Sequence, residues 1–240
     1  MATSSSAFKG YLSAFARPSA KNEEIPGPPA GKATGSDSAA EADEEVLRRT
    51  LPDFIRPGLD MLLIGINPGY MSAKTGHYYA GHGNHLWKSM YDAGLFPYPI
   101  DWRNDSEVLD WNIGLTNLVP RATRGQNDIL TEEFQSGAQE LRRKIYEFKP
   151  KILVFNGRKI YEAFRGTELQ HFGLQKSMGQ VQVYVMPSSS PRSSLYPRRE
   201  DKMHFYKGLK KLYDHVKDGV ALDVDEIQFE PKKRTTKTTP

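Results

Sequence analysis

The stretch MLLIGINPG, residues 61–69, decides how this chain is expected to fold. Its first six residues form an uninterrupted apolar run, which is typical of a strand buried on both faces of a parallel sheet. The cluster Asn67-Pro68-Gly69 that follows is typical of a tight turn. Functional groups of α/β proteins gather in the loops at the carboxyl ends of such strands, so the question is what the amide of Asn67 faces.

Three further segments rich in apolar residues are predicted to be strands of the same sheet: residues 113–118, 152–156 and 181–186. Helical spacing of apolar residues predicts four helices between and after these strands, at residues 84–94, 131–149, 158–164 and 201–216. Strands that alternate with helices predict a three-layer α/β domain, in which helices flank a central, four-stranded, mostly parallel sheet.

Composition excludes several classes of site. The chain has 240 residues and no cysteine, which excludes disulfides, thiolate nucleophiles and the common zinc frameworks. It has no apolar run of membrane-spanning length and no apolar signal core, so we expect a soluble protein that is not secreted and does not bind a membrane. The formal charge of +4 and the isoelectric point of about 9.0 favour a polyanionic partner.

The chain is predicted to have one domain between two tails. Residues 1–48 are rich in Ser, Ala, Gly, Pro and Glu, which predicts disorder, and residues 49–218 hold the periodic segments. Within the first tail, FKGYLSAF (residues 8–15) has helical spacing and is either a docking helix or a set of incidental aromatics. Residues 219–240 are predicted to be a basic, flexible tail, whose basic run at 232–237 is a nuclear address, a phosphate-seeking segment or solubilising charge.

Polar residues follow all four predicted strands. Asn67 follows the first strand, Asn117 and Asn156 lie at the ends of the second and third, and a serine run at 188–190 follows the fourth. A single asparagine in such a loop is usually a turn former, but three on one rim predict a site. The chain has neither a G-x-S-x-G elbow nor a Walker motif, and His77, His82 and His85 lack a clear metal partner. The predicted site therefore orients reactants instead of attacking them.

The stretch from Pro187 to Lys217 is strongly basic. It contains eight Lys or Arg residues and three acidic residues. Charge alone is equally consistent with a solvated helix face, but the serine-rich loop at its start favours phosphate binding.

Five motifs, taken together, point to a family. They are GINPG (65–69), GHYYAGHGNHLWKSMYDAGL (76–95), LTNLVPRAT (115–123), PKILVFNGRKIYEAF (150–164) and MPSSSPRSSLYPRREDKMHFYKGL (186–209). From about Leu51 to Val216 the chain resembles the thymine DNA glycosylase / mismatch-specific uracil DNA glycosylase family, and the eukaryotic thymine branch most closely. The resemblance implies a uracil-DNA-glycosylase fold whose active site lies at the strand ends and needs no metal or cofactor.

The resemblance also implies roles for individual residues. Asn67 matches the catalytic asparagine, whose amide holds the attacking water. The implied base pocket consists of Ile66, Ser72, Tyr78, Tyr79, Asn84 and Asn117. The implied DNA contacts are Arg158, Ser188, Ser189, Ser190, Pro191 and Arg192, with Arg192 as the wedge that fills the space left by the extruded nucleotide.

The expected activity is that of a monofunctional DNA glycosylase in base excision repair, acting on uracil opposite guanine, with thymine and other modified pyrimidines as further candidate bases. Ser72 stands at the pocket floor, where the thymine branch has a small apolar residue, which ranks G·U above G·T. Tyr78 stands where the vertebrate thymine enzyme has a second histidine, which argues against excision of oxidised 5-methylcytosine derivatives. The alternatives are a non-catalytic mismatch-binding module and, more remotely, a nucleoside hydrolase.

The resemblance extends to partners and location. Double-stranded DNA is the expected partner, and DVDEIQF (223–229) resembles the family's small-modifier-binding segment. We expect a nuclear monomer.

Overall fold

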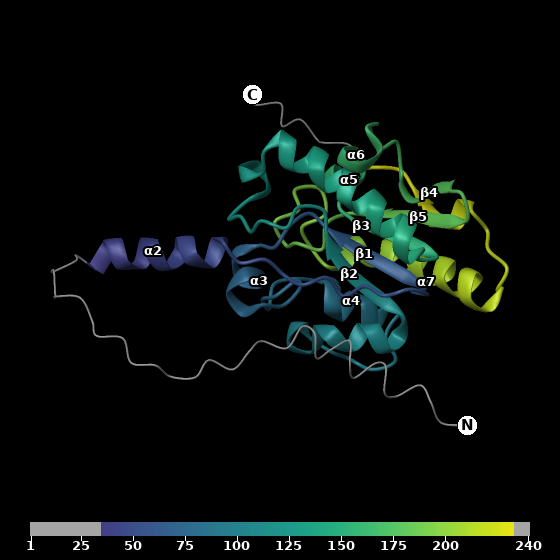
Figure 1. Cartoon of the computed structure of the whole chain (residues 1–240). Helices are drawn as coiled ribbons and strands as arrows, with labels where there is room; N and C mark the ends of the chain where they lie inside the picture. The colour runs from purple at the N-terminus through teal and green to yellow at the C-terminus, as the bar shows by residue number, and fades with distance from the viewer. Residues whose placement is uncertain (1–34, 233–240) are drawn as a thin grey trace, which may run out of the picture. The chain divides into compact units, whose positions relative to one another are not determined.

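A six-stranded sheet forms the centre of the structure, in the order β2-β1-β3-β5-β4-β6 (Figure 1). The computed structural model describes residues 35–232, of which those from Ala39 onward belong to one unit. Four strands run parallel: β2 (Ile113–Asn117), β1 (Met61–Gly65), β3 (Ile152–Asn156) and β5 (Val181–Met186). These are the four predicted strands, so the α/β architecture with a mostly parallel central sheet is confirmed.

The predicted strand number was wrong, because two antiparallel strands extend the sheet beyond β5. β4 (Phe172–Met178) pairs with β5 as a hairpin, and β6 (Gln228–Phe229) pairs with β4 at the edge. Both segments are partly exposed and carry polar residues, so they lack the continuous apolar signal that marks a central strand.

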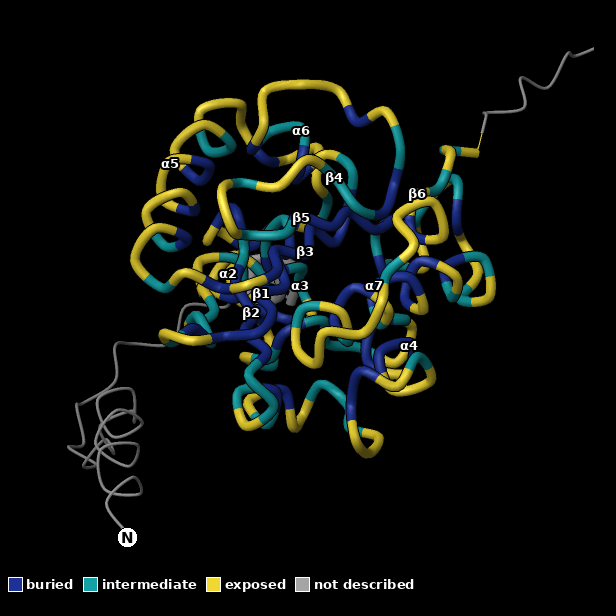
Figure 2. Tube along the Cα trace, turned by 90° about the vertical axis from the view of Figure 1, so that its right-hand side faces the viewer, coloured by how far each residue is buried: buried dark blue, intermediate teal, exposed yellow. Residues whose placement is uncertain are grey.

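The core follows from the composition of the strands. Every residue of β1 and of β3 is buried, as the dark blue strands in the interior of Figure 2 show. Removing this much apolar side-chain surface from water is the main stabilising contribution to the fold.

Helices cover both faces of the sheet. They are α3 (Tyr70–Thr75), α4 (Leu86–Asp92), α5 (Thr131–Phe148), α6 (Arg158–Arg165) and α7 (Met203–Asp218). In Figure 1, α5 and α6 lie on one side of the sheet, and α4 and α7 lie on the other. The four predicted helices correspond to α4, α5, α6 and α7, whereas α3 and the 3-10 segment Trp102–Trp111 were not predicted. No helix in the described part of the chain is long and apolar enough to span a membrane.

The segments next to the domain differ from the predicted tails. Helix α2 (Gly35–Leu47) occupies part of the first tail, and its Val46 packs against Ala73 and Ala122. In the second tail, the turn Asp225–Ile227 and β6 join the sheet, with Ile227 completely buried. The packed unit therefore ends beyond residue 218. The segment FKGYLSAF and most of the basic run at 232–237 lie outside the described residues.

Candidate active site

The amide of Asn67 is held in one orientation. Its Nδ2 donates to the carbonyl oxygen of Arg121 at 2.9 Å and to Oγ1 of Thr123 at 2.8 Å, so both of its N–H bonds are used. Thr123 Oγ1 in turn donates to the carbonyl oxygen of Gly125 at 2.8 Å. The Oδ1 atom accepts no hydrogen bond from any residue between 35 and 232, and it is therefore the atom that can accept one from a water or a substrate.

A second layer of contacts fixes the carbonyl that holds Asn67. The Arg121 guanidinium pairs with Glu133, with Nε and Oε1 2.7 Å apart, at the start of α5. This pairing lowers the pKa of Glu133 to about 2, so the contact persists at any physiological pH. Sequence reasoning missed the roles of Thr123, Arg121 and Glu133, although the first two lie in the quoted LTNLVPRAT motif. Their connection to Asn67 spans 54 residues or more of sequence.

Asn117 and Tyr79 meet above the end of β1. A Cβ atom added at Gly65 would lie 2.4 Å from Asn117 Oδ1 and 3.1 Å from the Tyr79 hydroxyl, so only glycine leaves room for both groups. The structure thus brings together two residues of the implied base pocket, the ring of Tyr79, which the resemblance makes the base-stacking aromatic, and the amide of Asn117, which it makes the contact to the polar edge of the base. The Tyr79 hydroxyl is buried and has no hydrogen-bond partner among the described residues, and its burial raises the pKa of Tyr79 above the ordinary range.

Asp105 holds the loop that carries the two tyrosines. Its buried carboxylate accepts from the backbone N–H of Tyr78 at 2.7 Å and lies 3.0 Å from His77 Nδ1. Tyr79 itself has a φ of 52°, in the left-handed region that bulky residues seldom adopt. The anchored neighbour maintains this conformation, which turns the Tyr79 ring toward Asn117. Asp105 gave no signal in the sequence, because an isolated aspartate in a polar segment predicts a surface position.

The side chains of Ser72 and Asn84 each accept one hydrogen bond from a backbone N–H group. Oγ of the buried Ser72 accepts from the Ala80 N–H at 3.2 Å, and Asn84 Oδ1 accepts from the Leu86 N–H at 3.1 Å at the start of α4. Within residues 35–232 the Ser72 hydroxyl proton and the Asn84 amide N–H groups have no acceptor. Ile66 follows β1 directly and is half-buried. The predicted pocket residues thus lie between β1 and α4, except for Asn117, which ends β2.

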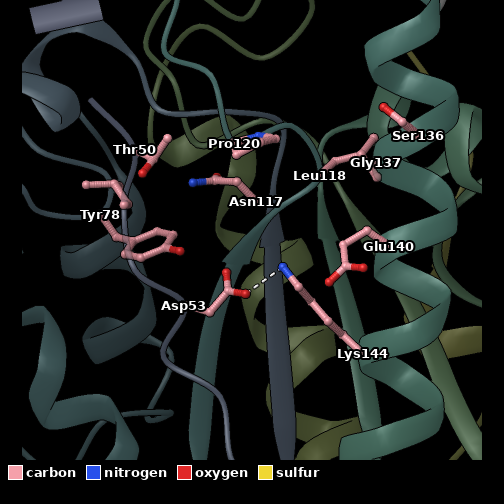
Figure 3. A pocket seen from close by; sticks show the side chains of 11 residues that line it. Thr50, Asp53, Tyr78, Asn117, Leu118, Pro120, Ser136, Gly137, Glu140 and Lys144 are labelled. Atoms are coloured by element: carbon pink, nitrogen blue, oxygen red, sulfur yellow. Dashed lines mark ion pairs between the residues drawn. The ribbon is translucent and has the colours of Figure 1, made fainter. Parts of the chain in front are cut away.

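A cavity of about 360 Å³ opens between β2, residues 50–53 and α5 (Figure 3). Asn117 and Tyr78 line it, whereas Asn67 does not. An ion pair between Asp53 and Lys144, with 2.5 Å between Oδ2 and Nζ, crosses its floor. The cavity therefore approaches the predicted base pocket from the β2 edge of the sheet, away from Asn67.

Residues 188–192, called here the serine loop, are organised from within. The Ser188 and Ser190 hydroxyls accept from the backbone N–H groups of Ser190 (3.3 Å) and Arg192 (3.2 Å). Ser189 is 1% exposed, and it exchanges two hydrogen bonds with Asn156, each 2.9 Å long. The prediction that Ser189 contacts DNA is therefore wrong for its side chain, which instead fastens the loop to the end of β3.

The two predicted DNA-contacting arginines differ. Arg192 is exposed at the tip of the serine loop, beside the exposed Pro191. Arg158 is paired with two carboxylates, since its Nε lies 2.7 Å from Glu162 and its Nη2 lies 2.6 Å from Glu168. Only Arg192 is free to enter a duplex without first breaking an ion pair. A phosphate at Arg158 would have to compete with Glu162 and Glu168.

The sequence of this domain matches one family model. Residues 52–213 match the uracil DNA glycosylase superfamily, which is more than half of the chain. The chain belongs to the uracil DNA glycosylase superfamily. A similar solved structure is the solution NMR structure of a "putative Uracil DNA glycosylase" from Methanosarcina acetivorans, with 23% identity, a TM-score of 0.46 and coverage of 68% of this chain and 98% of that chain. Membership of the superfamily supports a DNA glycosylase activity in this chain.

Proposed function

We propose that this uracil DNA glycosylase superfamily member is a monofunctional DNA glycosylase that removes uracil opposite guanine, leaving an abasic site. The fixed amide of Asn67 carries the proposal. With both N–H bonds committed to Arg121 and Thr123, the Oδ1 atom presents one acceptor at the rim. A water held there is oriented for addition to the sugar, and orientation alone can supply a large part of a rate acceleration.

An amide is not a useful base near neutral pH, so Asn67 orients the water without removing its proton. The glycosidic bond therefore has to be largely broken before water adds, which leaves an oxocarbenium-like sugar and an anionic base. In this proposal the amide N–H groups of Asn84 and Asn117 donate to the base oxygens and stabilise that anion. This mechanism favours bases that leave readily.

Two features rank the substrates. Extrusion of a mismatched base costs least, which favours G·U over A·U. The Ser72 hydroxyl is buried in the predicted pocket floor, and a thymine methyl beside it would leave a polar group poorly solvated. We therefore rank G·U above G·T and place the enzyme between the thymine and uracil branches of the family. DNA repair in the nucleus, as a monomer, is the corresponding cellular role that we propose.

The proposal is tested with enzyme in excess over labelled duplexes that contain G·U, G·T or A·U, followed by alkaline cleavage of abasic sites. We expect cleavage to decrease in that order, and to be lost in Asn67→Ala. Asn104→Ala is the matched control, because Asn104 is an exposed asparagine in the 3-10 segment Trp102–Trp111. Equal cleavage of G·U and A·U would remove the mismatch preference but leave the glycosylase.

Two other outcomes would replace the proposal. Tight binding to mismatched duplex without cleavage in any lane would identify a non-catalytic reader. Release of base from free nucleosides but not from duplexes would identify a nucleoside hydrolase.

A further inference from the structure

Lys202 is a completely buried lysine, 0% exposed, at the last position of the 3-10 turn Glu200–Lys202. Its Nζ donates to the carbonyl oxygen of Ser190 at 2.8 Å and lies 3.1 Å from Nδ1 of His85. The neighbouring Asp201 pairs with Arg198 and Lys232 instead. The ammonium group thus contacts two loops and no carboxylate among the described residues.

Under the proposed function, those two loops carry the wedge residue and part of the base pocket. One is the serine loop, whose Arg192 is exposed two residues beyond Ser190. The other is the loop that leads into α4, where Asn84 stands directly before His85. A backbone bond from the His85 N–H to the Ser189 carbonyl, 3.1 Å long, joins the loops at a second point.

The position of Lys202 is set independently of both loops. Its backbone N–H donates to the carbonyl of Arg199 at 2.9 Å, and the Arg199 guanidinium pairs with Asp92 at the end of α4, with 2.5 Å between Nη1 and Oδ2. The turn is therefore held by contacts that do not involve the Lys202 side chain. Such an anchor lets Nζ serve as a fixed point against which the loops are aligned.

Stability by itself does not call for a lysine here. Taking an ammonium out of water is costly, and burial lowers the pKa of Lys202 to about 8. Burial also lowers the pKa of His85, and the Lys202 charge lowers it further, which keeps His85 neutral with Nδ1 able to accept. Glu200 and Arg199 are the other charged groups that act on His85. An apolar residue of similar length would avoid this desolvation cost. The two hydrogen bonds of Nζ therefore remain as the reason for a lysine at this position.

We propose that Lys202 is a positioning residue that locks the serine loop to the loop carrying Asn84, so that the wedge and the base pocket keep a fixed relative placement. The proposal rests on the function proposed above. A misplacement of about 1 Å can cost about 10²-fold in rate, and here it would affect the coupled steps of wedge insertion and base capture. Loss of Lys202 should therefore impair reaction at a paired base, which has to be extruded, more than at an unpaired one.

The test compares Lys202→Met with Lys176→Met, which removes one exposed lysine from β4. Single-turnover rates are measured on a G·U duplex and on a single-stranded oligonucleotide with one uracil. Hydrogen–deuterium exchange of residues 188–192 reports the loop directly. We expect Lys202→Met to lose at least about tenfold on the duplex and less than about twofold on the single strand, with faster exchange in the serine loop and no loss of Tm. Lys176→Met should match the wild type in all four measurements.

A second pair of variants decides the matter if Lys202→Met does not fold. His85→Asn keeps an acceptor near the position of Nδ1, whereas His85→Leu removes it. We expect Asn to retain most of the duplex activity and slow loop exchange, and Leu to lose both.

Equal losses on duplex and single strand, or unchanged exchange in the serine loop, would overturn the role of Lys202. Absence of cleavage by the wild-type enzyme would instead refute the proposed function. In that case hydrogen–deuterium exchange of residues 188–192 would still show whether Lys202 holds the serine loop. Failure of the proposed function and failure of the role of Lys202 are therefore distinguishable.

Discussion

Two asparagines at the ends of neighbouring parallel strands are used in opposite ways. Asn67, two residues beyond β1, is half-buried, with its amide nitrogen fixed and its oxygen left open. Asn156, the last residue of β3, is 5% exposed and has both ends of its amide bonded to Ser189. The first presents an acceptor to a reactant, and the second fastens a loop.

The difference lies in what each asparagine meets across the rim. The amide nitrogen of Asn67 donates to the Thr123 hydroxyl and to the Arg121 carbonyl, and neither group donates to the amide oxygen of Asn67. Asn156 meets a serine that offers both a backbone N–H and a hydroxyl. The same residue type after the same kind of strand therefore becomes a reactive-site group or a structural one according to a partner that is more than 30 residues away.

The largest expected effect separates the two residues by activity. Asn67→Ala should lower the single-turnover rate on a G·U duplex by about 10²- to 10³-fold, because the water loses its orientation. The Kd for uncleaved duplex should change by less than about threefold, and the free energy of unfolding by less than about 1 kcal/mol, since water can reach the released acceptors. Rates and binding are measured on the same duplex. If both fell together, Asn67 would be structural.

The converse variant should act mainly on stability. Asn156→Ala removes both partners of buried Ser189 and should lower the free energy of unfolding by about 2 kcal/mol, measured by urea denaturation. Ser189→Ala, which keeps the backbone bond, should cost about half as much. The activity of Asn156→Ala should fall by about tenfold, less than that of Asn67→Ala, through loosening of the serine loop. A larger loss of activity than in Asn67→Ala would contradict the division of roles.

A third variant tests what the fastened loop presents. Arg192→Ala should reduce the duplex rate by roughly tenfold and leave the single-stranded rate and the Tm unchanged, because the exposed side chain acts only where a base has to leave a stack. A uniform loss on both substrates would refute the wedge assignment.

Binding of the wild-type protein to duplex should weaken steeply with salt, because phosphate contacts supply most of the affinity. A flat salt response would refute phosphate binding.

The smallest expected effect is a change in substrate preference, caused by a variant in the predicted base pocket. Ser72→Ala removes a buried hydroxyl from the predicted pocket floor and should raise the ratio of G·T to G·U cleavage by a few-fold. The Ala80 N–H loses its acceptor, so a loss of about 1 kcal/mol in unfolding free energy should accompany the change. Side-by-side rates on the two duplexes measure the ratio, and an unchanged ratio would mean that Ser72 does not face the C5 position.

The sequence by itself was sufficient for the parallel core. Residues 61–65 and 152–155 are apolar throughout and are buried throughout, because a central strand has no face left for water. The order of strands and helices also predicted that Asn67, Asn117, Asn156 and the serine run emerge at one rim. It did not reveal β4 and β6, whose half-exposed positions carry a mixed pattern, nor the packing of residues 225–229.

Only the tertiary structure decided which polar groups at that rim stay available. Thr123 and Arg121 fix Asn67, Asp105 fixes the Tyr78 backbone, and Lys202 joins two loops across more than 100 residues. A hydrogen bond depends on distances of about 3 Å, and the sheet sets those distances between segments that are far apart in the chain. Local sequence shows that a polar group will emerge, whereas its partner, and therefore its role, is a property of the fold.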